Sequence, residues 1–274
     1  MARAFRHASL ATGAVLCLML VAAALLSLVW QPYPTADIDV AAKLAAPSAA
    51  HWLGTDGLGR DVASLLLVGS RNSLAVGAVA VGLGLLAGVA LGCAAAAAGA
   101  WFDELAMRAC DVGFAFPALL TAIMLSAVYG PGLWMSVLAI GLFNVPVFAR
   151  ITRTAAAAVW SREYVTAARA AGLGPVAITL QHVLPNIAAA LIVQASISFA
   201  TAILAEAALS YIGLGTQPPQ PSWGRMLSDA QTLMFQAPML ALYPGLAIML
   251  SVLGLNLVGD GLRDWLDPRL ARSP

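Results

Sequence analysis

Residues 72–102 read NSLAVGAVAVGLGLLAGVALGCAAAAAGAWF, a run of 31 residues without one charged side chain. An α-helix rises about 1.5 Å per residue, and the hydrocarbon core of a bilayer is about 30 Å thick. The run is therefore long enough to cross a membrane as a single helix. It predicts a protein that folds in the bilayer rather than around a water-excluding core.

The composition of the whole chain agrees with this prediction. Of its 274 residues, 61% are hydrophobic and only 10% are charged. A soluble domain of this length cannot bury so much apolar surface in one core. The net charge of +1 provides no basic field for nucleic acid. We expect the lipid bilayer to be the main surroundings of the chain, and no nucleic-acid partner.

Other apolar runs predict the remaining spans. Residues 8–30 follow three basic side chains, and this run is longer than the core of a signal peptide, so we expect an uncleaved first membrane helix. Residues 112–149 are charge-free but interrupted by Gly130-Pro131-Gly132, which predicts a hairpin of two spans. Residues 187–213 and 238–259 complete the set. The expected fold is an all-α membrane protein with six transmembrane helices.

The distribution of lysine and arginine predicts the orientation of these helices. Basic residues concentrate on the cytoplasmic side of membrane proteins. With six spans, ten basic residues fall on the side of the termini: Arg3, Arg6, Arg108, Arg150, Arg153, Arg162, Arg169, Arg263, Arg269 and Arg272. Four fall on the other side: Lys43, Arg60, Arg71 and Arg225. We expect both termini in the cytoplasm.

Three glycines in residues 72–102 recur at a spacing of four: Gly84, Gly88 and Gly92. Small residues on one helical face let another helix approach closely. The neighbour is either a helix of this chain, which we favour, or a helix of a partner subunit.

The segment 150–186, between the fourth and fifth spans, is too long for a simple connector. Ser161 is a plausible helix N-cap, with the negative charge of Glu163 in the first turn. Gly172 fits the position after a helix end where φ is positive. Pro175 suits the first residue of a second short helix, and Pro185 is expected to stop it. The pattern predicts a short helix presented to a cytosolic partner.

The same segment resembles the EAA loop of ABC importer permeases. The resemblance rests on EYVTAARAAG at 163–172 and HVLPN at 182–186. In that family the loop forms a coupling helix that docks in a cleft of the ATP-hydrolysing subunit. The resemblance implies docking roles for Glu163, Tyr164, Ala167, Ala168, Gly172, His182, Pro185 and Asn186. Thr166 departs from the general pattern, which has Glu, and His182 replaces Ile as is typical of the peptide branch.

Further stretches are similar to the C-type permease subunits of dipeptide, oligopeptide and nickel ABC importers, members of the binding-protein-dependent transport system inner membrane components. They are LGTDGLGRD at 53–61, GSRNSL at 69–74, LSYIGLG at 209–215, PPQPSWG at 218–224 and DPR at 267–269. Without the resemblance, residues 53–61 still predict a tight turn, with Asp61 capping the next helix.

The resemblance implies a type I ABC importer permease fold and a multi-pass protein of the bacterial inner membrane. A membrane helix and an extracytoplasmic segment (1–71) would precede a permease core (72–274) that carries the coupling loop 150–186. The implied partners are a second homologous permease, two cytosolic ATP-binding subunits and an extracytoplasmic substrate-binding protein. Di- and oligopeptides are the expected cargo, with nickel as the alternative.

Glu206 is the one acidic residue that lies well inside a predicted span. Charged groups inside a membrane usually face the protein interior or water. Glu206 is therefore a candidate for the translocation path or a gate. The alternative is a carboxylate that reaches the interface or accepts hydrogen bonds from a neighbouring helix.

Chemistry-bearing motifs are missing from the sequence. The single lysine, Lys43, has no glycine-rich phosphate loop before it, and no hydrolase or metalloprotease motif occurs. His182 lacks a partner at metal-ligand spacing, and Cys17, Cys93 and Cys110 lie at or in apolar runs as packing residues. We expect no enzyme activity and no cofactor, with ATP hydrolysis on another polypeptide. The rival function is a secondary transporter driven by an ion gradient.

Overall fold

The computed structural model describes residues 2–266, with side chains from Ser9 to Trp265. The Asp267-Pro268-Arg269 motif lies outside the described residues. Five of the described helices are long and apolar enough to cross a membrane, and a bent pair makes a sixth candidate span. The expected all-α fold is confirmed, and the described residues form no named strand.

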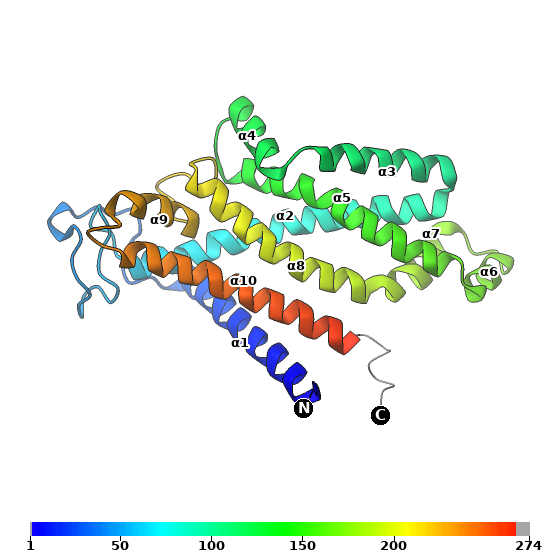
Figure 1. The fold of residues 1–274 in the computed structure, drawn as a ribbon, viewed down its shortest axis with the longest axis horizontal. Coiled ribbons are helices and arrows are strands. Elements are labelled where there is room, and N and C mark those ends of the chain that lie inside the picture. The colour runs from blue at the N-terminus through cyan, green and yellow to red at the C-terminus, as the bar shows by residue number, and fades with distance from the viewer. Residues whose placement is uncertain (1, 267–274) are drawn as a thin grey trace.

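The long helices form a bundle that is elongated along one axis of the molecule, with α1 inclined to the others (Figure 1). They are α1 (Ala2–Val29), α2 (Val62–Ala98), α5 (Leu133–Trp160), α8 (Leu184–Tyr211) and α10 (Met239–Leu266). At one end lie residues 30–61 with the short helix η1 (Val40–Ala42), α9 (Trp223–Ala230) and η3 (Gln231–Leu233). At the other end lie α6 (Glu163–Ala170) and α7 (Pro175–Ile178), which we call the coupling end.

Helix α2 begins and ends on local signals. The carboxylate of Asp61 accepts hydrogen bonds from the backbone N–H and the hydroxyl of Ser64, both at 2.8 Å. The predicted cap is therefore confirmed, and the helix starts ten residues before the charge-free run. Gly99, at φ +99°, ends the helix and turns the chain into α3 (Ala100–Ala115).

Helices α2 and α5 form the tightest pair in the bundle. A Cβ added to Gly84, Gly88 or Gly92 would lie 2.3–2.6 Å from atoms of α5. The glycine face therefore packs within this chain, as we favoured. Close backbone approach lets dispersion hold two helices together where lipid removes the hydrophobic drive.

The third span differs from its prediction. Instead of one helix from residue 112, the chain forms α3 and then α4 (Ala118–Tyr129), bent by 80°. Phe116 between them is extended, at φ −99° and ψ 118°, as residues before proline tend to be. α4 therefore projects sideways from the bundle in Figure 1. Because α3 begins at Ala100, it includes the four charged residues between the predicted apolar runs 72–102 and 112–149. They are Asp103, Glu104, Arg108 and Asp111.

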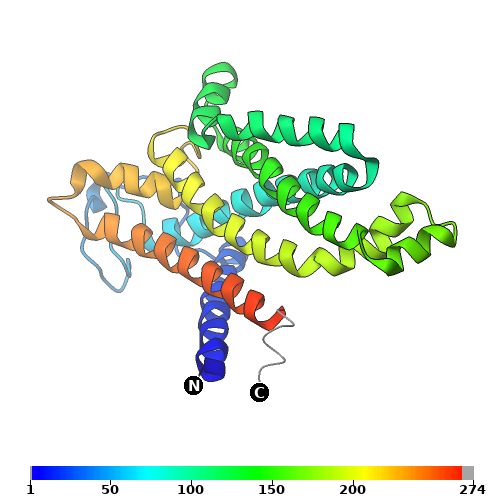
Figure 2. The same cartoon turned by 45° about the vertical axis from the view of Figure 1, so that its right-hand side comes forward.

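Helix α1 packs along α10 through small residues of both helices. A Cβ on Gly13 would lie 2.8 Å from Leu257, and one on Gly254 would lie 2.8 Å from Leu16. The first and last helices of the chain are therefore neighbours. Figure 2 shows α1 leaving the other helices at an angle.

The end opposite the coupling end is tied to the bundle by side-chain hydrogen bonds. The Asn72 amide donates to the carbonyl of Pro221 at 2.7 Å, and the Trp223 indole N–H donates to the carbonyl of Leu66 at 3.2 Å. Arg60 pairs with Asp56 at 2.7 Å and reaches Asp229 of α9 at 3.5 Å. These contacts fix residues 30–61 and α9 on α2.

Candidate functional site

The segment 150–186, which we call the coupling segment, begins its first short helix differently from the prediction. Ser161 is the C-cap of α5 rather than the N-cap of α6, and its hydroxyl donates to the carbonyl of Ala158 at 3.0 Å. Arg162 occupies the N-cap of α6 without a side-chain cap. Glu163 nevertheless lies in the first turn of α6, as expected, and Arg169 lies in the last turn, where a positive charge suits the helix dipole.

The turn after α6 agrees with its prediction. Gly172 has φ +87°, and its N–H donates to the carbonyl of Arg169 at 2.9 Å. Leu173 N–H donates to the carbonyl of Ala168 at 3.1 Å, which closes the helix end. No atom outside the turn lies within 4 Å of a Cβ built on Gly172. The glycine is therefore needed for its backbone conformation and not for space.

The second short helix is continuous with the membrane span that follows. Pro175 begins α7, as predicted, but Pro185 does not end it. A π-helical segment η2 (Thr179–Val183) joins α7 to α8, so residues 175–211 form one unbroken helix of 37 residues. The expectation of a stop at Pro185 is wrong because the proline sits in the first turn of α8, where the π turn has already shifted the hydrogen bonding.

The predicted coupling residues form two groups. Tyr164 of α6 and His182 of η2 meet edge to face, with ring centroids 6.1 Å apart, and the Asn186 amide donates to the carbonyl of His182 at 2.6 Å. Ala168, Gly172 and Leu173 form the turn behind them. Glu163, Ala167 and Pro185 are exposed.

The segment is anchored by buried side chains and presents exposed apolar ones. Val165 and Ile178 are almost completely buried and hold α6 and α7 against the bundle. Tyr164, Val176 and Leu180 are 45%, 73% and 59% exposed. Large apolar side chains on a polar end of a membrane protein indicate a surface that contacts another protein.

A groove connects this surface to the membrane-spanning helices. It has a volume of about 690 Å³. Its walls are Leu86 and Ala97 on α2 with Val176, Leu180 and Ile192 on the continuous helix. A displacement of the coupling segment would therefore change the width of the groove between α2 and the continuous helix 175–211.

Glu206 lies in α8 and is fully buried. Its carboxylate accepts hydrogen bonds from the hydroxyls of Ser73 at 2.9 Å, Ser210 at 2.6 Å and Thr216 at 3.4 Å. The Ser210 hydroxyl also accepts from the backbone N–H of Thr216 at 3.0 Å. The carboxylate thus joins α2, α8 and the turn after α8, a set of partners that satisfies its oxygens without a cation.

The sequence reasoning missed the ion pairs between α3 and α5. The Arg153 guanidinium donates to Asp103 at 2.8 Å, and Arg150 pairs with Asp111 and lies 4.7 Å from the centre of the Phe114 ring. The signal was available, because acids at 103, 104 and 111 and Arg108 recur at helical spacing beside an apolar run.

Metal-ligand residues do not gather anywhere between residues 2 and 266, where no group of three or more His, Cys, Asp or Glu could hold an ion. His182 contacts Tyr164 instead of a ligand partner. The three cysteines are free thiols, and Cys93 and Cys110 are buried as packing residues.

Comparison with known families gives an independent assignment. Residues 80–272 match the family described as binding-protein-dependent transport system inner membrane component. That range covers every span after the first half of α2, including the coupling segment and Glu206.

Individual relatives match over nearly the whole chain. The dipeptide transport system permease protein DppC of Alkalihalophilus pseudofirmus is 42% identical over 94% of this chain and 86% of its own length. The glutathione transport system permease protein GsiD of Pectobacterium atrosepticum is 41% identical over 97% of this chain and 88% of its own.

A solved structure has a similar fold. It is that of the MetNI methionine ABC transporter in inward-facing conformations, with a TM-score of 0.61, 18% identity, and coverage of 74% of this chain and 96% of the matched chain. At this identity the likeness concerns the fold alone.

Proposed function

Because this chain belongs to the family of binding-protein-dependent transport system inner membrane components, we propose that it is the permease subunit of an ATP-driven importer of di- and oligopeptides. The observation that carries the cargo class is the pair of relatives at 41–42% identity, which are named as dipeptide and glutathione permeases. Nickel import by the same fold is the alternative cargo. An ion-gradient mechanism has no support in these relatives.

We propose that the chain works in a complex with a second homologous permease, two cytosolic ATP-binding subunits and an extracytoplasmic binding protein. The family match supports this proposal, because the family consists of inner membrane components of transport systems that depend on a binding protein. Both termini and the coupling end would face the cytoplasm. Residues 1–71 would add a membrane helix and an external segment to the permease core 72–274, although the division falls inside the continuous α2.

The proposed docking surface for the ATP-binding subunits is the exposed part of segment 150–186. Val176 and Leu180 supply apolar contact, and the Tyr164–His182 pair fixes α6 against η2. Glu163, Ala167, Ala168, Gly172, Pro185 and Asn186 complete this surface. Nucleotide-driven movement of the partner would pass along the unbroken helix 175–211 into the membrane, which opens the path alternately to each side.

Glu206 is proposed to hold the outer end of the path closed. Its three hydroxyl donors lie on α2, α8 and the turn that carries Thr216. Separation of α2 and of the turn from α8 would leave the buried carboxylate with the Ser210 hydroxyl alone. Each buried hydrogen-bonding group left unsatisfied costs about 1–3 kcal/mol, and more when it is charged. The bond network therefore favours one arrangement of the three elements.

The function is tested in membrane vesicles that contain the whole complex. Dipeptide uptake should require ATP and the binding protein, and should survive collapse of ion gradients. The same vesicles should not accumulate nickel. Uptake that follows an ion gradient without ATP would overturn the importer, and nickel accumulation without dipeptide uptake would replace the cargo. The isolated chain should hydrolyse no ATP.

The orientation is tested with reporter fusions. Fusions at the C-terminus should be active only as cytoplasmic reporters. Fusions at Ala49 and Gln220, both exposed at the opposite end, should be active only as extracytoplasmic reporters. The reverse pattern would invert the topology.

A further inference from the structure

The exposed surface of α3 has two sides with different chemistry. Glu104, Arg108 and Asp111 recur at intervals of four and three residues and therefore lie along one side of the helix. They are exposed at 62%, 74% and 59% of their side-chain surface. Leu105 and Val112 form the adjacent side and are also exposed, at 57% and 62%. One side of α3 is thus charged and the other apolar.

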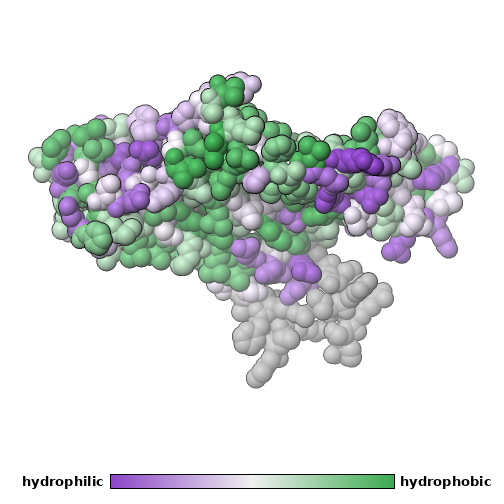
Figure 3. All heavy atoms as spheres, turned by 45° about the horizontal axis from the view of Figure 1, so that its top comes forward, coloured by the Kyte–Doolittle hydropathy of each residue, from purple (hydrophilic) through white to green (hydrophobic). Residues whose placement is uncertain are grey.

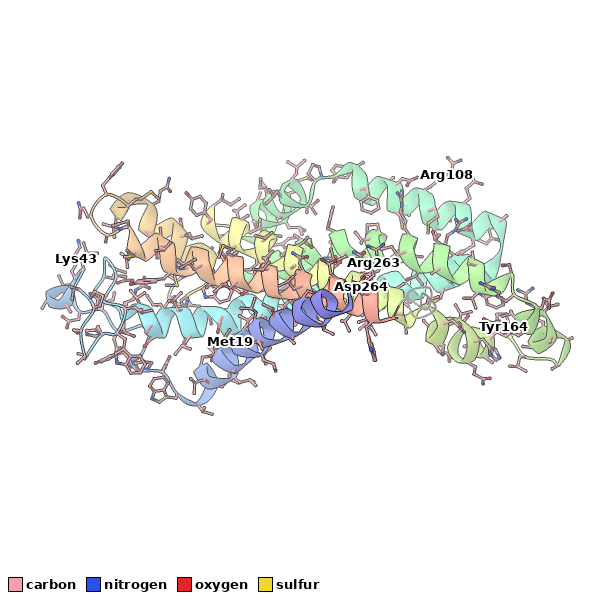
Figure 4. The ribbon with its side chains drawn as sticks, turned by 60° about the horizontal axis from the view of Figure 1, so that its bottom comes forward. Met19, Lys43, Arg108, Tyr164, Arg263 and Asp264 are labelled. Atoms are coloured by element: carbon pink, nitrogen blue, oxygen red, sulfur yellow. The ribbon has the colours of Figure 1, made fainter. Side chains whose placement is uncertain are left out.

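The charged side continues onto the neighbouring helix α5. Arg150 pairs with Asp111 and is 46% exposed. We call Glu104, Arg108, Asp111 and Arg150 the polar strip. Figure 3 shows a hydrophilic patch over the region where α3 and α5 lie, bordered by apolar surface. In Figure 4, Arg108 points away from the body of the bundle.

The polar strip extends to membrane depth. Trp101, 72% exposed at the start of α3, is the kind of residue that marks the membrane interface. Arg108 and Asp111 follow it by seven and ten residues, which places them about 10 and 15 Å further along the helix. Arg150 pairs with Asp111 and therefore lies at a similar depth. Asp111 and Arg150 thus lie near the middle of a hydrocarbon layer of about 30 Å.

Lipid is a poor neighbour for these groups. A charged side chain at the bilayer centre is unfavourable, and such residues normally face a protein interior or water. The ion pairs of the polar strip satisfy only part of its hydrogen-bonding capacity, because Arg108 contacts Glu104 through one carboxylate oxygen and each guanidinium carries five N–H donors. The remaining donors and acceptors require a polar medium.

We propose that the polar strip lines a water-filled path through which the cargo passes on its way to the coupling end. This inference rests on the proposed function and extends it to named residues. The strip carries two acids and two bases in alternation, so it has no net charge. Such a wall provides a partner for both the ammonium and the carboxylate of a peptide without binding either tightly. Peptides of either net charge can therefore pass it.

The test uses cysteine reactivity in the assembled complex. Cys17, Cys93 and Cys110 are first replaced by alanine, which removes the native thiols. Asp111→Cys and Val112→Cys are then compared, because these neighbours share a depth but point about 100° apart around α3. A charged, membrane-impermeant thiol reagent is added to inside-out vesicles. A membrane-permeant maleimide, added after unfolding, measures the total thiol.

The expected result is at least a tenfold faster modification of Asp111→Cys than of Val112→Cys, with the rate lowered by excess dipeptide. Equal rates, or an unreactive Asp111→Cys, would overturn the proposal; the second result is the one expected if the strip is covered by the partner permease. Glu104→Cys against Leu105→Cys repeats the comparison between neighbours without disturbing the Asp111–Arg150 pair.

Import by the cysteine-free parent separates the two proposals. If that parent imports dipeptide and the two positions react equally, the proposed function stands and the polar strip does not line the path. If Asp111→Cys is selectively modified but no import occurs with ATP, the strip faces water and the proposed function fails.

Discussion

Two prolines in similar apolar surroundings have opposite effects on their helices. At Pro117 the chain bends by 80° between α3 and α4, whereas at Pro185 the helix 175–211 continues without a break. The difference lies in the preceding residue, since Phe116 is extended and Leu184 remains helical, at φ −56° and ψ −44°. A proline alone therefore does not decide whether a helix ends.

The π turn explains why Pro185 is tolerated. Leu184 N–H donates to the carbonyl of Thr179, five residues back instead of four. A proline ring in a regular helix clashes with the carbonyl four residues earlier and removes one hydrogen bond. A widened turn just before the proline relieves both problems. The bend at Pro117 thus separates α3 from α4, while the π turn before Pro185 connects the coupling segment to the span α8.

The largest effect should come from breaking the continuous helix. Insertion of two glycines between Val183 and Leu184 should reduce dipeptide import by roughly 5- to 150-fold, the range of a coupling free energy of about 1–3 kcal/mol. The ATP-binding subunits should still copurify, because their docking surface is intact. Uptake and ATP hydrolysis are measured at matched expression.

The same insertion between Ala49 and Ala50, in the exposed external segment, is the control and should leave import unchanged. Normal import by the Val183–Leu184 insertion would mean that the helix does not transmit movement.

Gly172→Val should have the next largest effect. A β-branched residue at φ +87° is strained by about 1–2 kcal/mol, which corresponds to a roughly 5- to 30-fold loss if the strain opposes docking. Import should fall and the ATP-binding subunits should be retained less well in detergent. Gly174→Val is the matched control, since that site is equally open but has φ −75°. Equal loss in both variants would point to bulk instead of backbone conformation.

Pro117→Ala tests the bend between α3 and α4. Alanine favours a helix over proline by about 3 kcal/mol, so part of the population should straighten. Spin labels at Leu105 and Met124, both exposed, should then report a longer distance by pulsed EPR. Import should fall less than in Gly172→Val. An unchanged distance would show that packing, and not the proline, holds the bend.

Pro185→Ala should have the smallest effect. The helix already continues through this position, so stability should change by no more than about 1 kcal/mol and import should remain near normal. Thermal unfolding and uptake are measured on the same preparation. A loss as large as that of the glycine insertion would restore Pro185 as a structural stop.

The features that the sequence predicted correctly depend on a few adjacent residues. Asp61 caps α2 through Ser64, three residues away, and Gly172 and Pro175 fix a helix end and a helix start by their own backbone preferences. The glycines of α2 were also informative, because a face without side chains has few uses other than close packing.

The features that the sequence did not predict depend on distant partners or on competing neighbours. Ser161 closes α5 because α5 extends farther than its charge-free run. Glu206 could be identified as an intramembrane carboxylate, but its bond to Ser73 joins residues 133 positions apart. The span containing α3 was misplaced because charged residues were taken to lie outside the membrane. Ion pairs between α3 and α5 instead give Asp103 and Asp111 partners within the bundle.

The packing of α1 on α10 has a consequence for biogenesis. Gly13 contacts Leu257, so α1 emerges from the ribosome 244 residues before the surface that receives it. At about 5–20 residues per second, synthesis of the intervening chain takes roughly 12–50 s. During that interval the first helix must wait in the bilayer with its glycine face against lipid or an insertion factor. The last helix to be translated therefore completes the binding site for the first.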